Sequence, residues 1–290
     1  MTSVPEQDRL GAEWDTHRPA VFGVAYRLLG SVADADDVTQ DVWLRANAAD
    51  LDTVDDLHAW LVTVAARRSY DILKSAHRRR ESYVGPWLPE PLLTGPDASE
   101  PVLVDESVTA AMLLIMEKLS PPERVAFVLH DVFGIEFSRI AELLHVSVPG
   151  ARQLASRARR RVTSEREPAS PAPRAERERV LHAFRSAYEA GDLAGLVRLL
   201  DPDVVYVTDG GGKAAAARKL IHGGERVAEV MVRVGRRWRP DRIELVEVGG
   251  ELALLFHREG RVYSVDTVQI TAGRITAYRR VMNPDKLARL

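Results

Sequence analysis

The chain contains no cysteine, which excludes disulfide bonds, thiol redox sensing and zinc sites with cysteine ligands. It also lacks any run of about 18 apolar residues that could span a membrane. Its first ten residues, MTSVPEQDRL, lack the apolar stretch of a signal peptide. The net charge is only −2, so no overall field draws the chain to nucleic acid, and any such affinity must come from local patches. We therefore expect a cytoplasmic protein that contacts no membrane.

What is present indicates several packed domains. The length of 290 residues is typical of two or three domains, and a hydrophobic content of 46% is ample for their cores. Prolines cluster in two places, at about 84–101 and in PASPAP at 168–173, where helices cannot continue. We expect domains at 8–83, 105–166 and 174–290, joined by linkers at 84–104 and 167–173.

A helix-turn-helix pattern is the most informative feature of the sequence. Phe137, Ile140, Ala141 and Leu144 recur at helical spacing. Ser147 is a suitable N-cap for a second helix, whose inward stripe is Ala151, Leu154, Ala155, Ala158 and Val162. Its outward positions are Gly150, Arg152, Gln153, Ser156, Arg157 and Arg160, which suit a major groove and its phosphates. His145 stands in the turn, where a left-handed backbone is strained for a residue other than glycine.

Charge is segregated within the first domain. Residues 34–56 are rich in acids, whereas residues 67–80 are rich in basic side chains. Asp34, Asp36, Asp37 and Asp41 are expected on and around one helix whose Val38, Val42 and Leu44 pack inward. The following helix is basic and contains Tyr70, an arrangement that can hold phosphates and stack on an unpaired base. Alone, each half has an ordinary explanation as a solvated acidic helix or a basic helix end.

The third domain has an α+β pattern. It begins with a helix at Arg174–Ala190, and a second helix is expected around Gly224–Val234. The expected strands, from their β-branched and aromatic content, are Val204–Thr208, Ile243–Val248, Leu252–His257, Arg261–Ile270 and Ile275–Val281.

Together, the first two domains resemble the bacterial extracytoplasmic-function sigma factors, which direct RNA polymerase to promoters. The resemblance runs through AYRLLGSVADADDVTQDVWLRA, AWLVTVAARRSYDILKSAHRRR and the helix-turn-helix. It implies two all-α domains, 8–83 (region 2) and 105–166 (region 4), with RNA polymerase core and promoter DNA as partners.

The resemblance also implies roles for individual residues. Residues implied to bind the polymerase clamp are Asp34, Asp36, Asp37, Gln40 and Asp41. Those implied to bind the minus-10 element are Trp60, Arg67, Arg68, Tyr70, Lys74, Arg78, Arg79 and Arg80. Those implied to bind the minus-35 element are Ser147, Arg152, Gln153, Ser156, Arg157 and Arg160.

Three further segments, WLPEPL at 87–92, DGGGK at 209–213 and NPDKL at 283–287, resemble a subgroup of these sigma factors with a fused SnoaL-like domain of the NTF2-like superfamily. The resemblance implies a cone-shaped α+β domain that regulates the sigma factor in cis, without a separate anti-sigma factor. The glycines permit positive φ and close backbone approach, and the apolar pair in the linker is expected to dock on this domain. The expected regulatory contacts are Trp87, Leu88, Asp209, Gly210, Gly211, Gly212, Lys213, Asn283, Pro284, Asp285 and Lys286.

SnoaL-like folds also include enzymes, so a catalytic or ligand-sensing third domain is an alternative. By period-two alternation Asp266 points into the cone, and Tyr206, His222 and His257 are the other polar candidates. A lone Asp on such a face is more often satisfied by an arginine or a backbone amide. We therefore assign no catalytic residue, metal ligand or cofactor, and expect a sigma factor rather than an enzyme.

Overall fold

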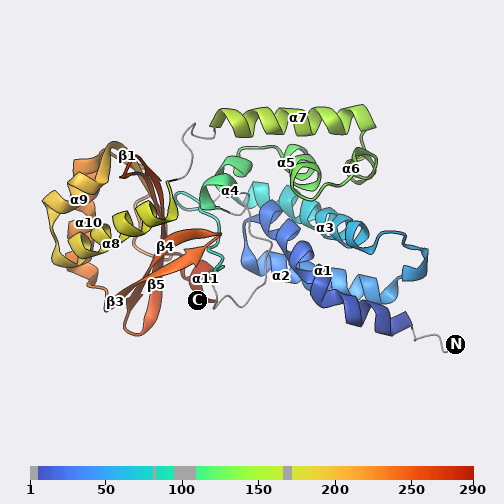
Figure 1. Ribbon diagram of the computed structural model, residues 1–290, viewed down its shortest axis with the longest axis horizontal. Helices are drawn as coiled ribbons and strands as arrows, with labels where there is room; N and C mark the ends of the chain where they lie inside the picture. The colour runs from blue at the N-terminus through green and yellow to red at the C-terminus, as the bar shows by residue number, and fades with distance from the viewer. Residues whose placement is uncertain (1–5, 81–82, 95–108, 166–171) are drawn as a thin grey trace. The chain divides into compact units, whose positions relative to one another are not determined.

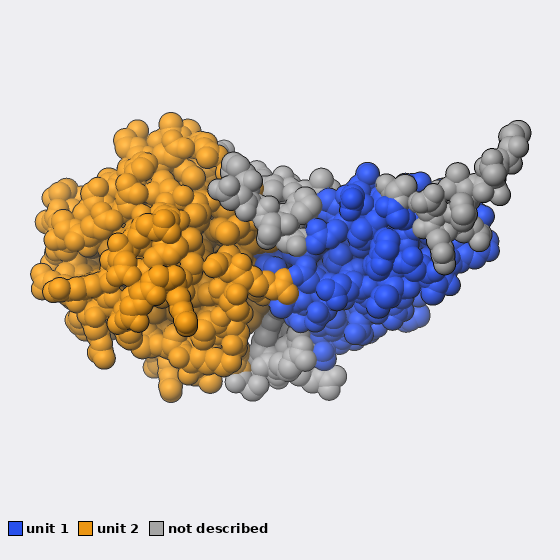
Figure 2. Space-filling view, turned by 90° about the horizontal axis from the view of Figure 1, so that it is seen from below, with its two compact units in different colours: residues 1–81, 98–108, 112–166 blue, residues 82–97, 109–111, 167–290 orange. Residues whose placement is uncertain are grey.

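The computed structural model describes residues 6–80, 83–94, 109–165 and 172–290, and within these ranges the side chains of 6–9, 12 and 76–80 lie outside the description. The chain divides into two compact units, shown in two colours in Figure 2. Unit 1 is residues 1–81, 98–108 and 112–166; unit 2 is residues 82–97, 109–111 and 167–290. No helix among the described residues is long and apolar enough to cross a membrane.

Unit 1 begins with three helices, α1 (Glu6–Leu29), α2 (Val32–Ala48) and α3 (Leu57–Arg80), with a short 3₁₀ turn, η1 (Leu51–Thr53), before α3. Helix α1 packs against both α2 and α3. Its core includes Phe22, Val42 and Leu61, all fully buried. Ser31 caps α2 by accepting a hydrogen bond from the backbone N–H of Asp34, which satisfies one of the free donors at the helix start.

The second helical region comprises α4 (Ala110–Glu117), α5 (Pro121–Phe127), the π-helical segment η3 (Val128–Val132), α6 (Phe137–Leu144) and α7 (Val148–Glu165). Its buried Arg124 donates a hydrogen bond of 2.9 Å to the carbonyl of Leu28 in α1 and contacts Glu117 at 2.5 Å. A buried guanidinium needs such partners, because leaving it unpaired is costly. The two expected helical domains therefore share one compact unit.

Unit 2 contains the α+β domain. Its helices are α8 (Arg174–Ala190), α9 (Leu193–Leu199), α10 (Gly224–Trp238) and α11 (Pro284–Leu287). Its strands are β1 (Leu200–Asp209), β2 (Ile221–His222), β3 (Arg242–Val248), β4 (Glu251–Arg258), β5 (Arg261–Thr271) and β6 (Arg274–Val281). They form one sheet in the order β2-β1-β6-β5-β4-β3, in which only β1 and β6 pair in parallel.

Helices α8, α9 and α10 pack against the sheet (Figure 1). The core between them includes Phe184, Met231, Leu254 and Tyr278. The expected fold class, two all-α domains followed by an α+β domain, is confirmed. The sequence pattern missed α9, β2 and α11, which are too short to show a period, and it began the first strand at Val204 instead of Leu200.

Candidate functional site

The acidic residues of the first domain gather on helix α2. Asp34, Asp36 and Asp41 are half-buried, whereas Asp37 and Gln40 are exposed. Asp41 forms ion pairs with Arg45 at 3.0 Å and with Arg68 of α3 at 3.4 Å. Asp41 is thus shared between the acidic and basic helices, and its contact with Arg68 also orients a residue implied to bind DNA.

The expectation that Leu44 packs inward is wrong. Val38 and Val42 are buried, but the side chain of Leu44 is 67% exposed. Two positions along an α-helix amount to about 200° of rotation, so Leu44 lies on the face opposite Val42. It shares its face with Asp37, Gln40 and Asp41, at spacings of three and four residues. The acidic surface therefore includes an apolar side chain.

Helix α3 presents the basic residues. Arg67, Arg68 and Lys74 are exposed, whereas Trp60 and Tyr70 are half-buried. The ammonium of Lys74 lies 3.9 Å from the centroid of the Tyr70 ring, a cation–π contact that holds the aromatic and the cation together. The side chains of Arg78, Arg79 and Arg80 lie outside the described residues.

The helix-turn-helix has the expected local geometry. His145 adopts the left-handed conformation, with φ 55° and ψ 47°. Ser147 accepts a hydrogen bond of 3.2 Å from the backbone N–H of Gly150, and Pro149 lies in the first turn of α7, where it costs no intrahelical hydrogen bond. The inward stripe from Ala151 to Val162 is buried. Phe137 is only half-buried, and Arg152 lies over its ring at 5.8 Å.

Two arginines of α7 form ion pairs with acidic residues of the preceding helices. Arg152, Gln153, Ser156, Arg157 and Arg160 are all exposed, as is Ser147 before the helix. Arg157 pairs with Glu123 at 3.0 Å, and Arg159 pairs with Asp131 at 2.7 Å. Glu123 also accepts hydrogen bonds from Ser120 at the start of α5. One carboxylate thus caps a helix and restrains an arginine implied to bind the minus-35 element.

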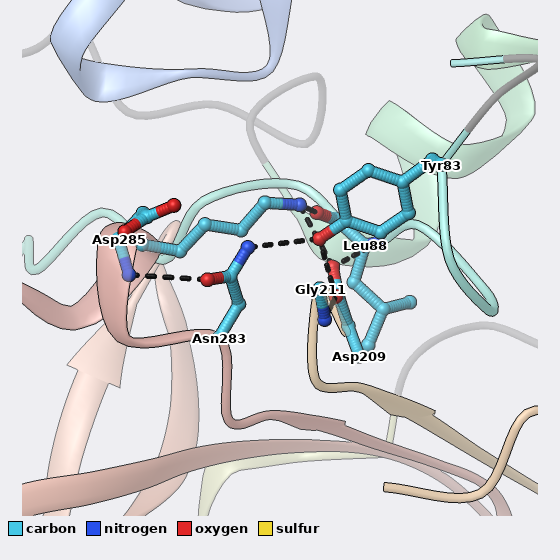
Figure 3. A network of polar contacts seen from close by, with 7 residues as sticks. Tyr83, Leu88, Asp209, Gly211, Asn283 and Asp285 are labelled. Carbon is cyan, nitrogen blue, oxygen red and sulfur yellow. Dashed lines mark hydrogen bonds and ion pairs between the residues drawn. The ribbon is translucent and has the colours of Figure 1, made fainter. Parts of the chain in front are cut away.

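In unit 2 the structure brings together the three segments expected to make regulatory contacts (Figure 3). We call residues 83–94 the linker strap. The centre of the contact is Asp209, which is 0% exposed. Its carboxylate accepts hydrogen bonds from the Tyr83 hydroxyl at 2.6 Å and the Leu88 backbone N–H at 2.9 Å, and it pairs with Lys286 at 2.8 Å. The backbone N–H of Gly211 also donates to it, at 3.0 Å, and a buried carboxylate with four such partners is well compensated.

The NPDKL segment closes the network. Asn283 donates a hydrogen bond of 2.9 Å to the Tyr83 hydroxyl. The ammonium of Lys286 also donates to the Leu88 carbonyl and lies 4.3 Å from the centroid of the Trp87 ring. Asp285 pairs with Lys213 at 2.5 Å. Pro284 is exposed at the start of α11.

The three glycines of the DGGGK turn lie where a side chain would collide with neighbouring atoms. Gly211 and Gly212 have φ values of 58° and 73°. A Cβ on Gly211 would lie 2.3 Å from Asn283, and one on Gly212 would lie 3.1 Å from Val84 of the strap. A Cβ on Gly210 would lie 2.6 Å from the carbonyl of Ala214. A side chain at any of these positions therefore displaces its neighbours, and at Gly211 and Gly212 it also strains the backbone.

The second half of the strap binds the sheet. Leu93 forms an antiparallel bridge with Val248, at the end of edge strand β3. The backbone N–H of Thr94 donates to Glu247, and that of Gly249 donates to Leu92. Leu88 and Leu92 are 2% and 3% exposed. Backbone pairing at an open sheet edge is a strong and register-defining mode of attachment.

Two families and several relatives match this chain. The Sigma-70 region 2 family matches residues 14–80, and the Sigma-70, region 4 family matches residues 109–162. The ECF RNA polymerase sigma factor SigJ of Mycobacterium tuberculosis is 40% identical, across 95% of this chain and 92% of that protein. The chain belongs to the ECF sigma factors. It therefore directs RNA polymerase to promoters and initiates transcription.

The similarity extends through the third domain of this sigma factor. The crystal structure of SigJ matches with a TM-score of 0.77 and 36% identity, over 96% of this chain and 98% of that one. A probable ECF sigma factor, SigI of M. tuberculosis, is 33% identical over 97% of this chain and 96% of its own length. Neither match is confined to the helical domains.

Several residues of the sigma factor's contacts escaped the sequence analysis. Tyr83, which contacts Asn283, carried no signal beyond being an aromatic side chain at the end of the expected first domain. Glu123 was recognisable only as a capping-box acid. Leu44 was assigned to the wrong face. For Tyr83 and Glu123 the missing information is a contact that the local pattern does not specify, whereas helical spacing by itself places Leu44 opposite Val42.

The polar candidates of the third domain are dispersed. Asp266 is buried and paired with Arg280, with Oδ2 2.7 Å from the Nε atom. Tyr206 is 3% exposed, in the core. His222 is exposed on β2, and His257 lies 3.5 Å from Glu244. The contact between Asp266 and Arg280 agrees with the expectation that an arginine satisfies this carboxylate.

Proposed function

We propose that the third domain of this sigma factor regulates promoter recognition by holding the linker strap, without the need for a separate anti-sigma factor. The observation that carries the proposal is the buried Asp209 carboxylate, bound by Tyr83 and Leu88 of the strap and by Lys286. Asp209 is in the third domain, whereas the strap is part of the segment that joins the two promoter-reading domains.

Within this proposal, three surfaces of the helical domains have separate roles. The exposed face of α2, with Asp37 and Gln40, docks on the polymerase core, where opposite charge gives specificity. The basic face of α3 with Tyr70 binds the minus-10 element. The outward face of α7 reads the minus-35 element, with Arg152 and Gln153 in the first turns of the helix, where base edges are reached.

In this proposal the third domain acts by limiting the distance that the linker strap can span between the two promoter-binding domains. Elements about 25 base pairs apart are roughly 85 Å apart along B-DNA at 3.4 Å per base pair. A free strap of residues 83–94 can span at most roughly 40 Å between its two ends. When the strap is anchored, its end-to-end distance is set by the third domain. The proteins with anchored and free straps therefore favour different spacings between the two promoter elements.

Run-off transcription tests this proposal on a set of promoters that differ only in the spacing of the two elements. Asp209→Asn removes the charge that Lys286 pairs with and weakens the anchor while keeping the side-chain shape. We expect the variant to initiate from a wider range of spacings than the parent, because a released strap restores reach.

Glu229→Gln is the matched control, because it makes the same charge change at an exposed position of α10 in the same domain. It should give the parent's spacing profile. If Asp209→Asn also gives that profile while hydrogen exchange shows a released strap, then strap anchoring does not control promoter choice.

A further inference from the structure

Arginines gather on the third domain where helix α10 ends and where the chain turns from β4 into β5. Arg236 and Arg237 lie in the last turn of α10, and Arg239 follows the helix directly. Arg258 ends β4 and Arg261 begins β5, and the two are direct cross-strand partners. The surface that we call the α10 arginine patch consists of Arg233, Arg236, Arg237, Arg239, Arg242, Arg258 and Arg261.

Direct contacts join the end of α10 to the β4–β5 turn. The guanidinium carbon of Arg258 lies 4.9 Å from the centroid of the Trp238 ring, and that of Arg237 lies 5.7 Å from it. The carboxylate of Asp241, which follows the helix, accepts a hydrogen bond from the backbone N–H of Glu259 in the turn. The arginines of the helix and those of the hairpin therefore belong to one surface.

Most arginines of the patch have no acidic partner. From position 233 to position 242 the sequence contains five arginines and one acid, on a chain whose net charge is only −2. Arg242 pairs with Glu244, and Arg258 pairs with Glu259 at 2.9 Å. The exposed arginines that form no ion pair with any described residue are Arg233, Arg236, Arg237, Arg239 and Arg261.

The free protein bears a cost for this arrangement. Arg258 and Arg261 stand directly opposite each other, and like charges at such positions destabilise a sheet. Arg233 and Arg237 are four positions apart on α10, a spacing at which like charges also repel. The helix dipole favours cations in the last turn, which accounts for Arg236 and Arg237 but not for Arg261 on a strand. A surface that retains this repulsion is suited to a polyanion.

We propose that the α10 arginine patch binds the phosphate backbone of promoter DNA. Duplex DNA carries one negative charge per about 1.7 Å of its axis, and a guanidinium binds phosphate through two parallel hydrogen bonds. The helical domains of a sigma factor bring the chain to promoter DNA, so a weak second contact on the same chain acts at high effective concentration. Phosphates carry no base information, so this contact is independent of sequence. It does not depend on the proposed role of the strap.

The salt dependence of DNA binding tests the proposal. Fluorescence anisotropy measures the affinity of the full-length protein for a labelled duplex of mixed sequence at several salt concentrations. Each phosphate contact adds about 0.9 to the slope of log affinity against log salt. Arg233→Gln/Arg236→Gln removes two charges, so the slope should decrease in magnitude by about 1.8, and binding at about 0.1 M salt should weaken roughly 10- to 60-fold.

Arg179→Gln/Arg198→Gln is the matched control. It makes the same charge change at exposed positions of α8 and α9 in the same domain. Arg177, close to Arg179 on α8, pairs with Glu251 at the start of β4, whereas Arg258 of the patch ends that strand. We expect this control variant to keep the parent's affinity and slope.

Arg261→Gln separates DNA binding from a structural role. The substitution removes the positive charge opposite Arg258, so the unfolding midpoint of the third domain should rise. The slope should nevertheless decrease in magnitude by about 0.9, with weaker binding of the duplex. A purely structural role of Arg261 would instead lower stability and binding together. This second variant also keeps the test valid if the double variant fails to fold.

The proposal is wrong if the parent protein does not bind the duplex at low salt, or if Arg233→Gln/Arg236→Gln behaves like the control variant. Polyglutamate of the same total charge is the second probe. It should bind about 5-fold or more weakly than the duplex, because its charges are more widely spaced than those of DNA. Equally tight binding of both probes, lost together in the double variant, would assign the patch to an acidic protein instead of DNA.

Discussion

Tyr83 and Asp209 are 126 positions apart in the chain, yet the Tyr83 hydroxyl donates a hydrogen bond of 2.6 Å to the Asp209 carboxylate. The same hydroxyl accepts a hydrogen bond from Asn283. One tyrosine therefore joins the linker strap to both the DGGGK turn and the NPDKL segment. Because its partners come from two separate segments, we expect a change in either segment to weaken the attachment of the strap.

The turn at Gly211 should tolerate no side chain. Gly211→Ala places a Cβ 2.3 Å from Asn283 and keeps a φ of 58°, whereas Gly260→Ala is equally left-handed, with a φ of 71°, and meets nothing within 4 Å. Both variants should lose about 1 kcal/mol of folding free energy to backbone strain. Gly211→Ala should also release the strap, measured as faster hydrogen exchange at residues 83–94. Equal exchange in the two variants would show that the contact with Asn283 is unimportant.

The anchoring of the strap should depend on the Tyr83 proton. Burial raises the pKa of Tyr83 above its usual value, and the hydrogen bond and charge of Asp209 add to the effect. A group whose pKa is raised on folding contributes stability that is present below its unfolded pKa, near 10, and lost as the pH rises through the folded value.

The measurement is the difference in thermal unfolding midpoint of the third domain between the parent and Tyr83→Phe. We expect a difference worth about 2 kcal/mol, the value of a hydrogen bond to a charged group, constant from about pH 7 to 9 and shrinking above about pH 10. The other tyrosines are the same in both proteins, so their contributions cancel in the difference between the two unfolding midpoints. If the difference between the two proteins already decreases between pH 7 and pH 9, the Tyr83 hydroxyl is not the group that controls it.

Leu44 should contribute to polymerase binding without contributing to stability. Its side chain is 67% exposed beside the acids of α2, so Leu44→Ser should leave the unfolding midpoint unchanged. Burying a Leu side chain contributes about 1.5–3 kcal/mol when the burial is complete, and we expect the affinity for core polymerase to fall about 10-fold, or 1.4 kcal/mol. Leu220→Ser, at a residue that is 49% exposed in the third domain, is the control. Equal affinities for both variants would remove Leu44 from the interface.

Glu123 should compete with promoter phosphates for Arg157. Glu123→Gln keeps a side chain that can complete the capping box with Ser120 but removes the charge 3.0 Å from Arg157. We expect tighter binding of minus-35 DNA, by about 2- to 5-fold for an exposed ion pair worth up to about 1 kcal/mol. Fluorescence anisotropy at several salt concentrations measures this. Unchanged affinity with an intact helix α5 would show that the pair does not restrain Arg157.

Local sequence patterns were sufficient to predict the helical features that depend only on residues three or four positions apart. The stripe of small residues in α7, the Ser147 cap and the acidic α2 all follow from spacings of three and four residues, because a helix brings such positions onto one face. The same rule, applied loosely, failed at Leu44: a hydrophobic side chain two positions after Val42 cannot share its face.

Period-two alternation in β5 also placed Asp266 in the interior, but the alternation alone could not name its partner. Arg279 and Arg280 are adjacent in the sequence, and only the pairing register of β5 with β6 sets Asp266 against Arg280. Which arginine lies inside is therefore a property of the folded sheet, since a shift of one residue exchanges the two faces.

By itself, the sequence determined the order of the helical domains, the acidic or basic character of their helices and the α+β character of the third domain. Each of these depends on residues within a few positions of one another. The tertiary structure alone decided that Tyr83 and Leu88 meet Asp209, that Lys286 completes its charge balance, and that Arg280 is the arginine that pairs with Asp266 in the core. Contacts between residues far apart in the chain are selected by the packing of whole elements, and that packing leaves no periodic trace in the sequence.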